Sequence, residues 1–395
     1  GSELGMAVNL STRGAVDAAN LVEYCNLPSG TYWSDLRRSH GNEEPFDIRV
    51  WFVGNEVDGP WNIGMKRAED YAWDAAEAAK AMRRIDPGIE LVAVGSSGTQ
   101  LPTYLEWDRK VLEQVYDCCD YISLHRYMAM PAIDSLSSYD RRDAGDYLEL
   151  ASRLDRNIQD VIAACDYVRG LKRSDKNMFI SMDEYNAIDI GPEDDAPAEE
   201  RQPWQIGPNP HARGISMRTT LLFGLSMITL MRRSDRIRIA CQSILINGDG
   251  LVICEEGEDA WVNGSYYVFL HCSRYGRGKV LEGVWECDRS DTTTFRNTEA
   301  AQGVCVYHEE SGELDIFVVN KRAEKLDFRL EPSCFAPLEP LEHIEMTAAL
   351  SARNSAQNPD AIRPVSKMDV NVMGREIRCE LAGYSWNVIR LKEER

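Results

Sequence analysis

The sequence predicts an α/β fold in which a (β/α)8 TIM barrel, with about six of its eight strands present, is followed by an all-β antiparallel sandwich. Three observations indicate this. Short apolar runs alternate with amphipathic helical stretches over residues 1–277. Over residues 278–395 the pattern changes to short alternating runs separated by turn residues. Two of the apolar runs in the first part end in a glutamate flanked by an amide side chain. We therefore expect a catalytic barrel domain over 1–277 and a sandwich domain over 278–395.

The barrel strands are predicted from short runs that are rich in β-branched and aromatic residues. Helices are expected between them, around 15–24, 65–84, 104–116, 146–171 and 216–231, with a further segment at 266–275 that closes the series. The helix over 65–84 is typical, since alanines and large apolar residues recur every three or four positions and Pro87-Gly88 stops it. The six predicted strands begin at Met6, Ile48, Glu90, Tyr121, Met178 and Ile237.

A closed barrel of this type needs eight strands, and only six are predicted. The chain starts almost at once on the apolar run 6–10. We therefore expect that the chain begins inside the barrel, and that a missing N-terminal segment or another chain supplies the other two strands.

The second part of the chain shows hairpin patterning. The runs 304–307 and 314–319 are joined by a short loop that contains Gly312, which indicates an antiparallel hairpin. Later runs lie at 328–330, 377–381 and 386–391, without a sustained helical period. A compact antiparallel sandwich is the expected result.

Composition limits the classes of partner. The 64 acidic and 44 basic residues give a formal charge of −20, which would repel nucleic acid and anionic membranes. No apolar run of about 18 residues indicates a membrane span. The 11 cysteines have no zinc-binding spacing and favour free thiols in a reducing cytoplasm. We expect a cytoplasmic protein with a neutral ligand and no metal.

The two glutamates are the strongest indication of function. Gly54-Asn55-Glu56 and Asp183-Glu184-Tyr185-Asn186 each close a predicted strand, and barrel enzymes carry their catalytic groups at the carboxyl ends of strands. A single glutamate there is more often a cap neighbour or half of a salt bridge. Two in matching positions, each beside an asparagine that could bind a sugar hydroxyl, favour a glycosidase with paired carboxylates.

Several segments, in order along the chain, resemble glycoside hydrolase family 51 α-L-arabinofuranosidases. The resemblance implies a retaining exo-hydrolase that removes terminal α-L-arabinofuranosyl residues from arabinan, arabinoxylan or their oligosaccharides. It also implies no cofactor and a homo-oligomer. The segments that carry it are Met6-Ala7-Val8-Asn9-Leu10, Leu21-Val22-Glu23-Tyr24-Cys25-Asn26, Gly54-Asn55-Glu56-Val57-Asp58-Gly59-Pro60-Trp61, Ile122-Ser123-Leu124-His125-Arg126-Tyr127 and Ser385-Trp386-Asn387-Val388-Ile389-Arg390-Leu391.

The resemblance implies a role for each matching residue. Glu56 would be the general acid/base and Glu184 the nucleophile. Asn55 would bind the sugar 2-hydroxyl and Tyr127 would hydrogen-bond the nucleophile, with His125 in the same pocket. On residue chemistry alone, His125 is as readily a core histidine and Tyr127 a packing aromatic.

Two further residues are candidates for substrate binding. Trp61 is interpreted first as loop packing and second as a sugar-stacking wall. Gln242 is expected to replace a family glutamine at the position where this chain has Ile244, because a two-residue shift keeps the same strand face. Tyr185 and Ile188 also depart from the family pattern, as does the composition of the loop 189–213, which includes the Pro- and acid-rich loop 191–210.

These departures leave alternatives open. One is a retaining hydrolase of different specificity, such as an endo-acting β-glucanase. The other is a catalytically impaired fragment or an interaction protein, which the incomplete barrel motivates. A substrate panel separates the first alternative from an arabinofuranosidase, and binding without turnover would identify the second.

Overall fold

A computed structural model describes residues 3–130, 143–189, 215–254, 257 and 259–394. The predicted loop 191–210 lies outside these residues. The chain divides into two compact units that alternate along the sequence, and the first comprises the residues up to Arg126 together with Arg156–Tyr185 and Arg236–Cys241. The remaining residues form the second unit. The predicted domain boundary between residues 277 and 278 stays a prediction.

The first unit is built around a curled six-stranded parallel sheet with the strand order β1-β2-β3-β4-β5-β6. This order confirms the six predicted barrel strands. The sheet follows the sequence order because each strand is joined to the next by a segment that returns along its outside, as in other parallel sheets. The strands are β1 (Gly5–Ala7), β2 (Val50–Val53), β3 (Glu90–Ala93), β4 (Tyr121–Met128), β5 (Phe179–Ala187) and β6 (Ile237–Gln242).

The first and last strands are shorter than the sequence predicts. β1 ends at Ala7, although Val8 and Leu10 beyond it are buried, so the apolar run 6–10 reflects burial rather than strand pairing. β6 ends at Gln242, and the apolar residues that follow are exposed, among them Ile244 at 60%. An apolar run thus gives the position of a strand more reliably than its end.

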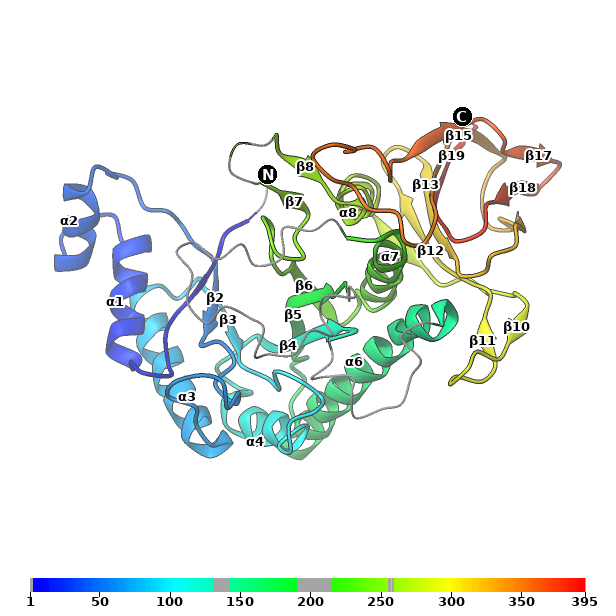
Figure 1. The fold of residues 1–395 in the computed structure, drawn as a ribbon. Helices are drawn as coiled ribbons and strands as arrows, with labels where there is room; N and C mark the ends of the chain where they lie inside the picture. Colours follow the sequence, from blue (N-terminus) through cyan, green and yellow to red (C-terminus); the bar gives the residue numbers. More distant parts are fainter. Residues whose placement is uncertain (1–2, 131–142, 190–214, 255–256, 258, 395) are drawn as a thin grey trace. The chain divides into compact units, whose positions relative to one another are not determined.

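Helices line one face of β2 and β3 (Figure 1). Alanines of α3 let it pack closely, and eight of its residues are buried, including Tyr71 and Met82. The sequence pattern missed α2, whose N-cap Thr31 accepts a hydrogen bond from the backbone of Ser34. The helices are α1 (Ala15–Asn26), α2 (Tyr32–Ser39), α3 (Ala68–Ile85), α4 (Glu106–Val115) and α6 (Ala144–Lys172), which begins in the second unit and ends in the first.

The second unit contains two largely buried helices, α7 (Met217–Arg232) and α8 (Gly264–Tyr275). α7 packs on α8 and on three strands of the large C-terminal sheet, which explains why it is apolar on nearly every side. Its approach is close: a Cβ at Gly224 would lie 2.8 Å from the ring of Trp386. The indole of Trp386 donates a hydrogen bond to Nδ1 of His271 in α8.

The C-terminal sheets confirm the predicted antiparallel sandwich. The hairpin predicted from 304–307 and 314–319 is present as β12 and β13, paired from Ala301↔Asn320 to His308↔Glu313. One sheet has the order β16-β15-β19-β13-β12-β9 and the other β14-β18-β17. Their strands are β9 (Lys279–Leu281), β12 (Ala301–His308), β13 (Glu313–Asn320), β14 (Leu326–Leu330), β15 (Leu338–Thr347), β16 (Val365–Lys367), β17 (Asn371–Met373), β18 (Glu376–Leu381) and β19 (Ser385–Glu393). Two short pairs, β7 (Val252–Ile253) with β8 (Trp261–Val262) and β10 (Arg289–Ser290) with β11 (Thr298–Glu299), were not predicted.

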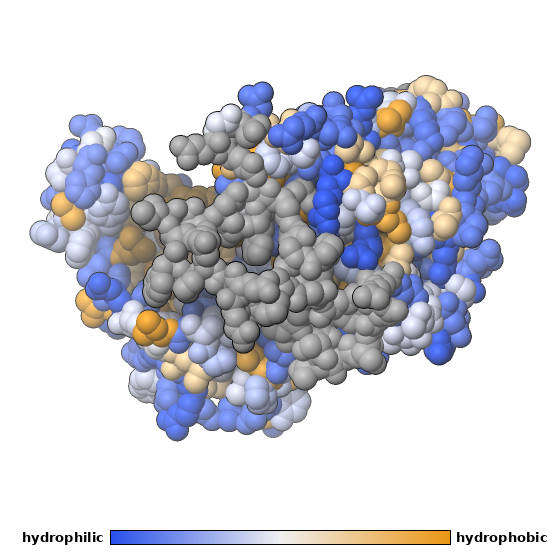
Figure 2. Space-filling model, in the orientation of Figure 1, coloured by the Kyte–Doolittle hydropathy of each residue, from blue (hydrophilic) through white to orange (hydrophobic). Residues whose placement is uncertain are grey.

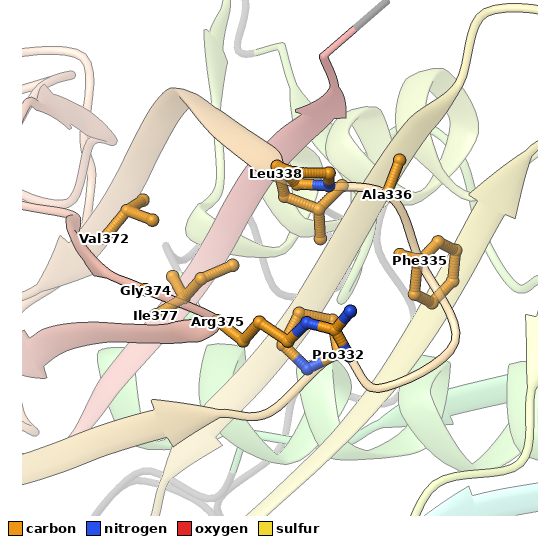
Figure 3. A pocket seen from close by; sticks show the side chains of 9 residues that line it. Pro332, Phe335, Ala336, Leu338, Val372, Gly374, Arg375 and Ile377 are labelled. Atoms are coloured by element: carbon orange, nitrogen blue, oxygen red, sulfur yellow. The ribbon is translucent and has the colours of Figure 1, made fainter.

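Alternate residues of the two sheets fill the sandwich core, as the period of two requires. β13 contributes Leu314, Ile316 and Val318. β18 contributes Ile377, Cys379 and Leu381. Beside this core a small hollow of about 20 Å³ lies between the turn after β17 and the segment that leads into β15, with Val372 and Phe335 at opposite sides of the view (Figure 3). No predicted sugar-binding residue lines it.

The surface agrees with the acidic composition. Hydrophilic side chains cover most of the visible described surface, and apolar ones are scattered between them (Figure 2). Within the described residues, none of the helices combines the length and the apolar character that a membrane span requires.

Candidate active site

The turn that follows β2 presents Glu56. Gly54 has a φ of +113°, and a Cβ there would lie 3.1 Å from Val57 and 3.2 Å from Val94, so a glycine is required for both reasons. Glu56 itself has a φ of +46°, a left-handed conformation that costs a non-glycine residue free energy. The sharp turn lifts the Glu56 side chain from the end of the strand. Asn55 is exposed beside it.

Glu184 is held differently, because it lies within β5 rather than beyond it. Its neighbour Asp183 is 12% exposed and Glu184 is 27% exposed. β5 belongs to the same sheet as β4, which carries His125.

His125 joins the acidic side chains. It is 2% exposed, and its Nδ1 lies 3.1 Å from Oε1 of Glu56 and 3.7 Å from Oε2 of Glu184. Its Nε2 lies 3.3 Å from Oδ1 of Asp183. Both glutamates thus approach the same imidazole nitrogen, and a carboxylate oxygen of Glu56 lies within 4.8 Å of one of Glu184.

The charges of the cluster shift the pKa values of His125 and Glu56. Burial lowers the pKa of His125, but the hydrogen bond and charge of Asp183, followed by Glu56 and Glu184, outweigh burial and raise this pKa to about 10. His125 is therefore a cation at neutral pH. Burial raises the pKa of Glu56, but the hydrogen bonds from His125 and Trp61 and the charge of His125 lower it below its ordinary value.

Trp61 contacts the acid/base candidate directly. Its Nε1 donates a hydrogen bond of 2.5 Å to Oε2 of Glu56, although 51% of the side chain stays exposed. Neither interpretation from the sequence, loop packing or sugar stacking, includes this contact. The sequence feature that comes nearest to indicating this contact is the short separation of Glu56 and Trp61, which lie five residues apart in one loop.

Two buried polar groups support the strand ends. The hydroxyl of Tyr71 donates to the carbonyl of Val53 and accepts from the backbone of Val94, so it bridges the ends of β2 and β3. Asp58 accepts hydrogen bonds from the backbone and the hydroxyl of Ser97. Burial raises the pKa of Asp58 despite these bonds.

The other predicted site residues belong to the second unit. The hydroxyl of Tyr127 donates to Oγ of Ser243 at 2.8 Å. Nε2 of Gln242 is buried and has no hydrogen-bond partner among the described residues. Asn186 donates to the carbonyls of Ser243 and Asp249 and so ties the end of β5 to the segment that follows β6.

The spacing of Glu56, His125 and Glu184 also matches what a divalent metal ion would need. Two of the three donors are the paired carboxylates themselves, and His125 is a cation when its pKa is about 10. Metal binding there would require His125 to lose its proton, which its raised pKa opposes.

Comparisons with known proteins identify the family. Residues 4–145 match the model of the α-L-arabinofuranosidase 1 domain, and residues 183–385 match that of the α-L-arabinofuranosidase C-terminal domain. The intracellular exo-α-(1→5)-L-arabinofuranosidase 1 of Bacillus subtilis is 40% identical over 100% of this chain and 76% of that protein. The chain belongs to the family 51 α-L-arabinofuranosidases.

Other relatives extend the comparison. An exo-α-(1→6)-L-arabinofuranosidase of Bifidobacterium longum is 33% identical over 99% of this chain and 75% of its own length. The structure of a family 51 arabinofuranosidase from the same species has a TM-score of 0.88 and 28% identity, covering 99% of this chain and 76% of that one. The Thermotoga maritima enzyme, at 22% identity and a TM-score of 0.80, shares the fold over 98% of this chain and 75% of its own.

Sequence reasoning missed two residues that surround the catalytic pair of this arabinofuranosidase family member. Asp183 was taken only as the neighbour of Glu184, because successive residues of a strand point to opposite faces. His125 nevertheless has Asp183 at one ring nitrogen and Glu184 at the other. Tyr71 was predicted only as an apolar position of a helix, and no pattern signals that its hydroxyl bridges two strands.

Proposed function

We propose that this protein is a retaining exo-α-L-arabinofuranosidase in which Glu184 is the nucleophile and Glu56 the general acid/base. The separation of the carboxylates carries the proposal. Oxygens of the two groups lie within 4.8 Å, whereas retaining glycosidases hold their carboxyl groups about 5 to 5.5 Å apart and inverting ones about 6.5 to 9.5 Å apart. The short spacing leaves no room for a water molecule on the far side of the sugar.

In the first step, Glu184 attacks the anomeric carbon while Glu56 gives its proton to the leaving oxygen. Glu184 has to be ionised for this step, and Nδ1 of His125 lies 3.7 Å from its Oε2. The product is a covalent arabinosyl-enzyme and a free leaving group.

Glu56 has to be protonated in the same step, although its pKa is lowered in the free protein. Burial is the largest of the influences on this pKa, and it acts to raise it. A bound sugar would exclude more water from Glu56 and strengthen that influence. In the second step Glu56 is the base, and it takes a proton from the water that releases arabinose.

The remaining residues would bind and position the sugar. Asn55, exposed beside Glu56, would bind the 2-hydroxyl, and Gln242 would offer its unpartnered amide to another hydroxyl. Tyr127 would orient the nucleophile, as the family resemblance implies. Trp61 would hold Glu56 through the indole hydrogen bond.

The substrates we propose are arabinan, arabinoxylan and their oligosaccharides with terminal non-reducing α-L-arabinofuranosyl residues. The names of the relatives support this choice, since they are exo-acting arabinofuranosidases specific for α-(1→5) or α-(1→6) linkages. Several of these relatives are named intracellular, which supports a cytoplasmic location. We also propose a homo-oligomer, which light scattering of the purified protein would test.

The deciding experiment is hydrolysis of 4-nitrophenyl α-L-arabinofuranoside, followed by proton NMR. We expect the α-anomer of arabinose to appear first, because double displacement retains the configuration. Glu184→Ala should abolish turnover, and a β-glucan should not be hydrolysed. First appearance of the β-anomer, a preference for glucan, or full activity of Glu184→Ala would contradict the proposal.

A further inference from the structure

A second hollow lies in the first unit, between the segments that follow β2 and β3. It is a groove of about 770 Å³, open to solvent, and its walls come from the ranges 58–69 and 101–110. Most of the exposed area of these walls is apolar, and Pro60, Met65, Leu101 and Pro102 are among the residues that line it. Met65 is 51% exposed, so one wall offers apolar surface to a ligand. Leu101 in the other wall is 8% exposed, so its side chain is held by its neighbours.

The groove begins next to the acid/base candidate. Asp58 and Pro60 line it, and Gly59 between them lies under the ring of Trp61, where a Cβ would come within 2.5 Å of the indole. That indole donates its hydrogen bond to Glu56. A single turn of chain therefore connects the groove to the carboxyl group that would protonate the leaving oxygen.

The charges in the groove are already paired. Nζ of Lys66 lies 2.5 Å from Asp74, and Nε of Arg67 lies 2.8 Å from Asp70. Nζ of Lys110 lies 2.7 Å from both Glu69 and Glu106, which also line the groove. An anionic ligand would have to displace one of these carboxylates, whereas a neutral ligand would not. The surface therefore fits a neutral molecule with apolar faces and hydroxyl groups.

We propose that this groove binds the leaving-group side of the substrate, as a neutral chain of pentose units that extends from the scissile bond. The inference rests on the proposed function, and it names the part of the polysaccharide that this surface contacts. The acid/base residue faces the leaving oxygen, so a groove that begins beside Glu56 meets the sugars that depart. Their C–H faces would pack on Met65 and on the prolines.

The test compares two substrates that differ only on the leaving-group side: 4-nitrophenyl α-L-arabinofuranoside and α-(1→5)-arabinotetraose. We measure the ratio of kcat/KM for the tetraose to kcat/KM for the aryl glycoside. Met65→Ser removes apolar surface, and Thr103→Trp places a large ring in the groove. Each should lower this ratio about tenfold, mainly through KM for the tetraose, because tenfold corresponds to losing the burial of roughly one to two methylene groups.

Two control variants separate this effect from a general loss of structure. Met65→Leu keeps an apolar side chain of similar volume and should keep the ratio. Trp73→Ala changes a residue of α3 that is 60% exposed and does not line the groove, so its ratio and its activity should match the wild type.

An unchanged ratio in both Met65→Ser and Thr103→Trp would overturn the inference. So would an equal loss on the two substrates. A wild-type protein that fails to hydrolyse the aryl glycoside would instead overturn the proposed function, and the groove assignment with it. These results are distinguishable, because the aryl glycoside reports the reaction at Glu56 and Glu184 and carries no pentose chain for the groove to bind.

Discussion

The ends of β2 and β5 present the two glutamates that we propose as catalytic in contrasting ways. Glu56 lies beyond β2, on a turn with left-handed backbone at Gly54 and at Glu56 itself. Glu184 lies inside β5, in extended backbone that belongs to the sheet. A carboxylate that attacks one atom gains from a fixed position, whereas one that must give and later take a proton gains from a turn that neighbouring groups can adjust.

The largest expected effect separates the two roles by their dependence on the leaving group. Glu184→Gln should reduce kcat by at least about 10⁴-fold with every substrate, since no covalent intermediate forms. Glu56→Gln should cost about 10²- to 10⁴-fold with arabino-oligosaccharides but far less with 2,4-dinitrophenyl α-L-arabinofuranoside, whose leaving group needs no proton. Steady-state kinetics with both substrates checks this. Equal losses in Glu56→Gln on the two substrates would contradict the acid role.

The second effect concerns the turn. Gly54→Ala should lower the free energy of unfolding by about 1 to 3 kcal/mol, because the new Cβ meets Val57 and Val94 on a left-handed backbone. It should also reduce kcat by displacing Glu56. Gly30→Ala is the matched control: its φ is +89°, but a Cβ there has open space. Urea unfolding and steady-state kinetics of both variants separate the loss caused by the contacts with Val57 and Val94 from the loss caused by the left-handed backbone alone.

The third effect lies between the two glutamates, at His125. Its pKa is raised from 6.5 to about 10 in the folded protein, so the folded state holds the proton more tightly than the unfolded state. The stability that this provides is fully present below about pH 6.5 and is lost as the pH rises to about 10, at no more than about 1.4 kcal/mol per pH unit.

His125→Gln should therefore flatten the fall of Tm between pH 6.5 and 10. His40→Gln changes an exposed histidine and should keep the wild-type profile. If Tm of His125→Gln falls between pH 6.5 and 10 as steeply as that of the wild type, protonated His125 does not provide this stability and does not hold the two strand ends together.

The smallest effect is a shift of the pH–rate profile. Trp61→Phe removes a hydrogen bond that lowers the pKa of Glu56, so this pKa should rise. The alkaline limb of kcat/KM, which reports the acid in the free enzyme, should move upward by less than about one pH unit. Trp73→Phe is the control, since Trp73 is exposed on α3. A downward movement, or none, would show that the indole does not act on Glu56.

The sequence was informative where a single requirement, such as burial, decides which residue types occupy a segment. Apolar runs located all six barrel strands and the hairpin of β12 and β13, because burial dictates such runs. It was less informative about strand ends, since Val8 and Leu10 are buried without continuing β1. Helix α2 was missed because its capping box pairs Thr31 with Ser34 instead of the more recognisable glutamate.

For the candidate site, the sequence predicted the two glutamates and His125, which the structure brings together. It gave no sign of the indole hydrogen bond of Trp61, because such a contact depends on the path of a five-residue turn. The second bond of His125, to Asp183, was hidden for another reason. The alternation of a regular strand assigns Asp183 and Glu184 to opposite faces, while a single imidazole with two nitrogens contacts both.

The hydroxyl of Tyr71 has a consequence for how such an enzyme can diverge. Where β2 and β3 separate, this one phenol satisfies the last carbonyl of β2 and the first amide beyond β3. The backbone is thus fully bonded up to the point where the loops depart, and those loops carry the apolar groove. Exchanges at Pro60, Met65 and residues 101–103 would leave these two hydrogen bonds of Tyr71 in place, as well as those that Trp61 and Asn62 donate to Glu56. The surface beside the candidate site can therefore vary while the strand ends that present the glutamates stay fixed.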